Sequence, residues 1–171
     1  MNEITFRAVT PRDMPLLKKW IASPHWQEWW GDTEIELTEI AANLDSDSVE
    51  PMIVELDDKP VAYVQTYDPH MEDAHPYQDQ PFGTIGIDLS ISDAGDMNKG
   101  LGTAILNALA ELLFGEGVTR LIIDPHPDNE AAIACYKKAG FAAFDTRESL
   151  SGPALMMALD NPNPDEFEEE I

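Results

Sequence analysis

Cysteine is nearly absent from this chain of 171 residues, in which Cys135 is the only one. An internal disulfide is therefore excluded, and the composition favours a reducing compartment. No apolar run approaches the ~20 residues that a membrane-spanning helix requires. The first residues, MNEITFRAV, have neither the basic start nor the apolar core of a secretory signal. We therefore expect a cytoplasmic protein without a membrane partner.

Basic residues are also scarce, since 10 Lys and Arg stand against 33 Asp and Glu, for a formal net charge of −23. Such a surface disfavours nucleic acid and anionic membranes as partners. It suits a cationic small molecule, because an acidic cleft speeds its capture. Solubility or adaptation to high salt explains the same surplus, so both interpretations stay open. Activity in molar salt would favour adaptation, whereas a KM that rises steeply with modest salt would favour steering.

The alternation of apolar segments and chain breakers predicts one mixed α/β domain over residues 1–159. Residues 160–171 form an acidic tail with six acidic and no basic residues, which we expect to be disordered or loosely docked. Expected strands cover residues 4–9, 52–56, 61–67, 83–91, 121–124, 141–146 and 154–159. Expected helices begin after Thr10 and end at Pro24, and then cover residues 38–44, 100–114 and 129–139.

The segment over residues 68–82 has no apolar periodicity and holds three prolines, two histidines and four acidic residues. A loop of this length in a compact domain is usually functional or mobile. His70 and His75 lie within it, but their spacing does not match a metal site. We therefore expect no bound metal.

A glycine-bearing turn precedes the helix expected over residues 100–114. Gly100 and Gly102 free the backbone of a helix N-terminus to approach a phosphate, although a plain loop-to-helix turn has the same pattern. The turn is neither a Walker loop nor a dinucleotide fingerprint, because Ile105 stands where the latter has its third glycine. Asn129 and Tyr136 lie about two helical turns apart, so both can border one cleft.

These segments together resemble the GNAT acetyltransferases, which use acetyl-coenzyme A. In that family a Q/R-x-x-G-x-G/A turn holds the pyrophosphate, and here Met97 at its first position removes one side-chain contact but leaves the backbone cradle. Six motifs in order are similar to those of the aminoglycoside 6'-N-acetyltransferases: residues 26–31 (WQEWWG), 63–67 (YVQTY), 86–88 (GID), 99–103 (KGLGT), 124–125 (DP) and 135–141 (CYKKAGF). The resemblance implies the GNAT fold, a mixed, mostly antiparallel sheet flanked by helices, whose splayed central strands admit the pantetheine arm.

The resemblance also implies roles for individual residues. Tyr136 matches the acid that protonates the departing thiolate, although a helix-face tyrosine is often plain core. Asp88 matches the acid beside the acceptor amine, although strand alternation could instead place it outward and solvated. The expected cofactor contacts are Ile87, Leu89, Asn98, Lys99, Gly100, Leu101, Gly102, Thr103, Asn129 and Tyr136.

The expected acceptor contacts combine carboxylates with aromatic and amide side chains. Tryptophan is more often core, and Asp124 before a proline could be a simple turn starter. Gln65 and Tyr67 lie two apart on a strand and so point to one face. The expected substrate-binding residues are Trp29, Trp30, Gln65, Tyr67, Asp79, Asp88 and Asp124.

The function that the resemblance implies is acetyl transfer from acetyl-coenzyme A to the 6'-amine of aminoglycosides, by direct attack in a ternary complex. Another amine fits the cofactor residues equally well, such as a polyamine, a lysine-type siderophore precursor or a protein N-terminus. A catalytically silent domain that binds coenzyme A is a further alternative.

Overall fold

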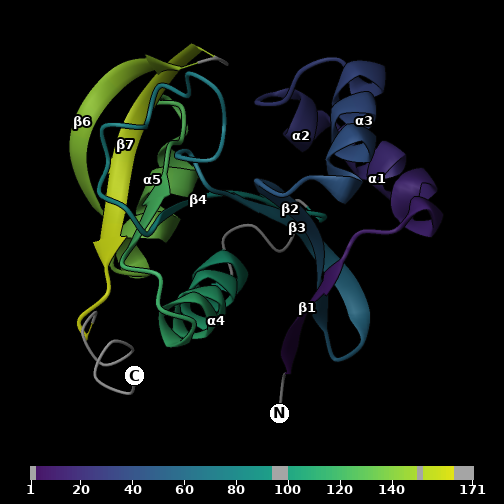
Figure 1. The fold of residues 1–171 in the computed structure, drawn as a ribbon. Helices are drawn as coiled ribbons and strands as arrows, with labels where there is room; N and C mark the ends of the chain where they lie inside the picture. The colour runs from purple at the N-terminus through teal and green to yellow at the C-terminus, as the bar shows by residue number, and fades with distance from the viewer. Residues whose placement is uncertain (1–2, 94–99, 150–151, 164–171) are drawn as a thin grey trace.

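The computed structural model describes residues 3–93, 100–149 and 152–163 (Figure 1). Asn98 and Lys99, two expected cofactor contacts, lie outside these residues, as does most of the acidic tail. The elements in chain order are β1 (Ile4–Ala8), the 3-10 turn η1 (Pro11–Asp13), α1 (Met14–Ile21), α2 (Pro24–Gln27), α3 (Thr33–Ala42), the 3-10 turn η2 (Asn43–Asp45), β2 (Val49–Leu56), β3 (Lys59–Tyr67), β4 (Thr84–Ile91), α4 (Leu101–Gly115), β5 (Arg120–Ile123), α5 (Glu130–Lys138), β6 (Ala142–Ser149) and β7 (Gly152–Asp160).

The described strands form one sheet in the order β1-β2-β3-β4-β5-β7-β6. Every neighbouring pair is antiparallel except β4 and β5, which run parallel. β2 and β3 join through Asp57 and Asp58, whose φ angles of 50° and 68° give the tight turn that suits a hairpin. The expected mixed, mostly antiparallel sheet flanked by helices is therefore confirmed.

The two faces of the sheet are covered differently. On one face α4 and α5 bury a continuous core that includes Leu106, Leu109 and Tyr136 against β2–β5 and β7. On the other face α1–α3 cover one end, over Ile53 and Tyr63. The far end of that face carries a separate cluster built with the loop over residues 68–82. Figure 1 shows this loop beside β6 and β7, well apart from α1–α3.

The parallel pair at the centre of the sheet is short. Its register runs only from Thr84 opposite Arg120 to Ile87 opposite Ile123, four residue pairs in all. β4 continues to Ile91, whereas β5 ends at Ile123. The strands therefore part after Ile87, and the expected splay lies between β4 and β5.

Several boundaries differ from the sequence expectation. α3 begins at Thr33 and not at residue 38, because Asp32 caps it by accepting a hydrogen bond from the Ile35 amide at 3.2 Å. Pro24 begins α2, since a proline fits the first turn of a helix. At the other end β7 reaches Asp160, one residue beyond the expected strand, and the Asn161 side chain donates to the Val118 carbonyl at 2.9 Å.

None of the helices in the described part of the chain has the length and apolar character that crossing a bilayer requires.

Candidate active site

A cleft of about 790 Å³ opens where β4 and β5 separate. Its floor is the stretch of β4 from Ile87 to Ile91, together with Ile123 and Asp124 at the end of β5. Side chains of α2 and α3 form one wall, and α5 with Gly102 of α4 forms the other. The cleft therefore occupies the gap that shortened strand pairing leaves in the sheet.

Three alternate residues of β3 meet three different environments on the same face of the sheet. Tyr63 lies under α1–α3, and Tyr67 lies under the loop over residues 68–82. Gln65, between them, lines the cleft. The structure therefore brings Gln65 to the cleft but not Tyr67, whose buried ring packs against His75 with ring centres 5.3 Å apart.

Asp88 lies opposite Gln65 in the β3–β4 register and receives a hydrogen bond from its side-chain amide at 2.9 Å. The Tyr63 hydroxyl in turn donates to the Gln65 amide oxygen at 2.6 Å, which orients the amide nitrogen towards Asp88. Burial and the nearby charge of Asp124 raise the pKa of Asp88 to about 7, against the opposing effect of the Gln65 hydrogen bond. Asp88 is therefore a carboxylate poised to gain or lose a proton near neutral pH.

Asp124 ends its strand inside the same cleft and accepts a hydrogen bond from the Tyr77 hydroxyl at 2.6 Å. Burial raises the pKa of Asp124, and the Tyr77 hydrogen bond opposes that rise. The two carboxylates interact, so they titrate as a pair. Each one is held by a neutral donor and not by a cation, which leaves their negative charge available to a ligand.

The surroundings of this pair are acidic and aromatic. Among the described residues that line the cleft there is no Lys or Arg, while five are acidic: Glu28, Glu36, Glu39, Asp88 and Asp124. Trp29 is 36% exposed and its ring lies 5.4 Å from that of His126, and the Trp30 indole donates to the Ser90 hydroxyl at 2.7 Å. Aromatic faces beside carboxylates suit a cationic ligand that also has apolar ring surface.

The start of α4 has features that fit an acyl-coenzyme A. Gly100 takes the left-handed conformation (φ +82°) directly before the 15-residue helix α4, and a Cβ there would meet open space. The first amides of a helix have no partner within the helix, and such a helix start suits a pyrophosphate ligand. Gly102 lines the cleft, and a larger residue there would collide with α5, because a Cβ would lie 2.7 Å from the Cys135 sulfur. The lack of a side chain at Gly102 therefore lets α4 lie close to α5.

Tyr136 belongs to the core under α5 and yet lines the cleft, because the gap between β4 and β5 exposes it from that side. Its side chain is 8% exposed, and burial raises the pKa of its phenol above the ordinary value. The hydroxyl is therefore protonated at neutral pH and can donate a proton or a hydrogen bond. Asn129 also lines the cleft, where its side chain caps α5 by accepting from the Ala132 amide at 3.2 Å.

The structure brings most of the expected residues together, but it places some elsewhere. The cleft is lined by Trp29, Trp30, Gln65, Ile87, Asp88, Leu89, Gly102, Asp124, Asn129 and Tyr136. Asp79 does not line it, because its carboxylate forms an ion pair with Arg147 at 2.7 Å. Gly100, Leu101 and Thr103 do not line it either. The Thr103 hydroxyl donates to the Cys135 carbonyl at 3.2 Å.

Three further residues at or beside the site were not predicted from the sequence. Tyr77 lies in a loop without periodicity, 47 positions from the carboxylate that it contacts. Glu36 lines the cleft from a part of α3 that was not expected to be helical. His126 also lines the cleft. Its place directly after the Asp124-Pro125 motif could have indicated this from the sequence. No group of three or more metal-binding side chains occurs in the part of the chain that the structure describes.

Comparison with known proteins agrees with this geometry. The model of the acetyltransferase (GNAT) domain matches residues 10–148. The aminoglycoside N(6')-acetyltransferase type 1 of Klebsiella pneumoniae is 36% identical over 165 residues, which cover 91% of this chain and 82% of that protein. A crystal structure of the aminoglycoside acetyltransferase AAC(6')-Ib with coenzyme A and kanamycin has a TM-score of 0.85 and 34% identity over 98% of this chain and 99% of that one. AAC(6')-Ib with ribostamycin and coenzyme A also has a TM-score of 0.85, at 32% identity over 99% of both chains. This chain therefore belongs to the GNAT acetyltransferases.

Proposed function

We propose that this protein transfers the acetyl group of acetyl-coenzyme A to the 6'-amine of aminoglycosides. The observation that carries the proposal is the pair of carboxylates, Asp88 and Asp124, in an acidic cleft whose other wall presents Tyr136. A polycationic amine is the ligand that such a cleft favours. The names of the relatives support the same acceptor class, since they are aminoglycoside acetyltransferases.

Acetyl-coenzyme A supplies an activated acetyl group, and the protein must supply a neutral amine beside it. An aminoglycoside amine is protonated near neutral pH and cannot attack in that form. Asp88, held by Gln65, can first bind the ammonium group and then accept its proton, directly or through water. Its pKa of about 7 leaves a large ionised fraction at neutral pH and still makes it a useful proton acceptor.

Two further groups serve the transfer. Backbone amides of β4 from Ile87 to Leu89 lie on the floor of the cleft, where they can polarise a carbonyl group without any reorganisation. The Tyr136 phenol, kept protonated by burial, can supply a proton to the leaving side of the reaction. Attack is direct, and we assign no covalent intermediate to the single cysteine, Cys135.

The decisive measurement is thiol release from acetyl-coenzyme A in the presence of kanamycin, tobramycin or ribostamycin. We expect turnover with each of these 6'-amines and none with an analogue that carries a 6'-hydroxyl group. Turnover confined to polyamines or peptide N-termini would contradict the aminoglycoside assignment. Binding of coenzyme A without turnover on any amine would identify a silent domain.

The rate of transfer should depend on the ionisation of Asp88. Because its pKa is raised to about 7 and only the ionised form accepts a proton, kcat/KM should fall as the pH drops through about 7. Measurement from pH 5.5 to 9 tests this, with the residual rate of Asp88→Asn reporting the titration of the acceptor amine alone. A wild-type profile that parallels the variant over this range would contradict the role of Asp88.

Removal of the Tyr136 hydroxyl should slow the chemical step selectively. Tyr136→Phe keeps the ring in the core and deletes only the proton donor, so we expect kcat to fall by about 10²-fold. The KM for acetyl-coenzyme A should change little, because the ring still fills its place. Steady-state kinetics under saturating acceptor provide the measurement, and an unchanged kcat would exclude Tyr136 as the acid.

A further inference from the structure

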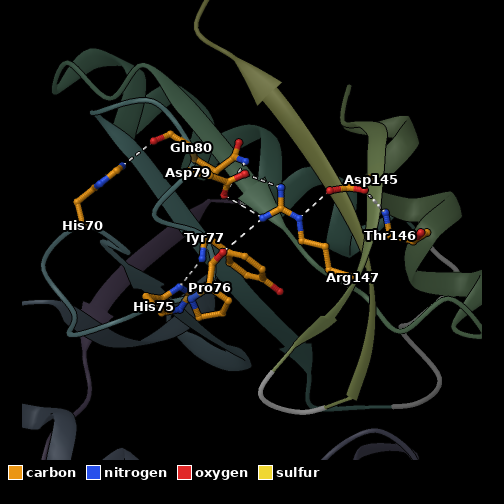
Figure 2. A network of polar contacts seen from close by, with 9 residues as sticks. All are labelled: His70, His75, Pro76, Tyr77, Asp79, Gln80, Asp145, Thr146 and Arg147. Carbon is orange, nitrogen blue, oxygen red and sulfur yellow. Dashed lines mark hydrogen bonds and ion pairs between the residues drawn. The ribbon is translucent and has the colours of Figure 1, made fainter.

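The loop over residues 68–82 joins β3 to β4, and one arginine of the edge strand β6 binds it. Arg147 binds both oxygens of Asp79, at 2.9 and 2.7 Å, and also donates to the Pro76 carbonyl at 3.4 Å. Its Nε donates to Asp145 on the same strand at 2.7 Å, which holds the guanidinium in place (Figure 2). Hydrogen bonds from the Arg147 guanidinium, together with its charge, lower the pKa of both Asp79 and Asp145, so the pairs remain ionic at neutral pH.

Tyr77 lies between the two residues that Arg147 contacts in the loop. Its side chain is 2% exposed in the cluster that also contains Tyr67, Ile122 and Met156. The Arg147 guanidinium lies over its ring, 5.9 Å from the centre, and the Tyr77 amide donates to a His75 ring nitrogen at 3.1 Å. Figure 2 shows the tyrosine side chain directed away from the ion pair, and its hydroxyl reaches Asp124 at 2.6 Å.

Arg147 and Asp79 are partly exposed, and an ion pair of that kind contributes little to stability. Its bidentate geometry, however, fixes a position and a direction. What it fixes is the stretch of loop from which the Tyr77 hydroxyl reaches Asp124. The contacts thus form a chain from the surface to the site: Arg147 to the loop, the loop to Tyr77, and Tyr77 to Asp124.

We propose that Tyr77 and Arg147 are positioning residues for the acceptor: Arg147 anchors the loop so that the Tyr77 hydroxyl orients the Asp124 carboxylate towards an ammonium group of the substrate. This inference rests on the proposed function and deepens it. The Tyr77 hydroxyl engages one carboxylate oxygen and so restricts its rotation. An oriented, ionised carboxylate then binds an amine of the acceptor other than the one that reacts at Asp88.

Tyr77→Phe is the direct test, because it deletes the hydroxyl and leaves the ring. We expect the KM for kanamycin to rise about tenfold, the scale of one hydrogen bond to a charged group, with kcat changed less than about twofold. The KM for acetyl-coenzyme A should not change, since Asp124 faces the acceptor. An unchanged KM for kanamycin would overturn the proposal, as would an equal rise in both KM values.

A double-mutant cycle tests whether Arg147 acts through Tyr77. Arg147→Gln alone should raise the KM for kanamycin by no more than Tyr77→Phe does, and Arg147→Lys should restore part of the loss. In the Tyr77→Phe background, Arg147→Gln should add less than about twofold, because the contact that it supports is already gone. Additive effects would overturn the proposal.

Arg120→Gln is the matched control. Arg120 is likewise a strand arginine in an ion pair, with Asp160 at 3.0 Å, and it also lies over an aromatic ring, that of Phe144. Its side-chain exposure of 21% is close to the 22% of Arg147. Among the described residues it forms no hydrogen bond or ion pair with the loop, so both KM values should stay within about twofold of wild type. Asp79→Asn, which weakens the anchor from the loop side, should reproduce Arg147→Gln.

Wild-type turnover separates this inference from the proposed function. If the wild-type enzyme acetylates no aminoglycoside, the proposed function fails first. If it does so, and the cycle shows independent effects, only the positioning role fails. Thermal unfolding of each variant shows that the compared proteins are folded.

Discussion

Asp88→Asn should lower kcat for aminoglycoside acetylation by about 10²- to 10⁴-fold, the range that general base catalysis contributes. The substitution keeps the size of the side chain and an oxygen that can accept from Gln65, but it removes the proposed proton acceptor. Binding of acetyl-coenzyme A should remain intact. The measurement is kcat at saturating concentrations of both substrates, with cofactor affinity from calorimetry.

Asp88→Asn removes a negative charge as well as the proposed base, and a control must separate these two effects. Asp128→Asn is a suitable control, because Asp128 lies near the cleft residue His126 but its side chain is 83% exposed. It removes the same charge from the same end of the molecule, and kcat should stay within about twofold. A similar loss of kcat in both variants would show that Asp88 acts only through the field of the cleft.

Gly86→Ala should destabilise the fold by about 3 kcal/mol, the upper end of the usual range for overpacking. Gly86 lies opposite Tyr67 in the β3–β4 register, and a Cβ there would stand 2.0 to 2.5 Å from three ring carbons of that side chain. The ring is buried against His75 and cannot simply swing aside. The midpoint of thermal unfolding should fall by about 9 °C in a chain of this length.

The cause can be isolated with two further variants. In a Tyr67→Leu background the clash is relieved, so Gly86→Ala should have less than half of its effect there. Gly115→Ala provides the matched control, because a Cβ at Gly115 has no atom within 4 Å and the residue ends a helix. That change should alter stability by less than about 1 kcal/mol. An undiminished loss in the Tyr67→Leu background would contradict the steric explanation.

Much of the fold could be predicted because its signals are local. Apolar segments bounded by turn-forming residues predicted each strand, and the glycine turn at Gly100 predicted the start of α4. The boundary of α3 could not be predicted in this way, because the residues between Thr33 and Ala42 show little amphipathic contrast and the helix start depends on the cap at Asp32.

The candidate site was predictable to the extent that motif residues line the cleft, as Asp88, Asp124 and Tyr136 do. Strand alternation placed Gln65 and Tyr67 on one face, but it does not say which part of that face is open. Helices, cleft and loop divide the face, and only the packed structure shows that Tyr67 lies under the loop. The partner of Asp124 was hidden for a similar reason, since Tyr77 reaches it from a segment without a pattern.

The short parallel pairing at the centre of the sheet makes two half-sheets, β1–β4 and β5–β7, which share only four residue pairs. The loop over residues 68–82 leaves one half and fastens to the other, through Arg147 on β6 and Asp124 after β5. One segment is thus both a link between the two half-sheets and the support of Asp124 on the floor of the cleft. We expect substitutions in this loop that change the range of acceptors to weaken the contact between the two half-sheets as well. Acceptor range and the stability of this contact should therefore change together.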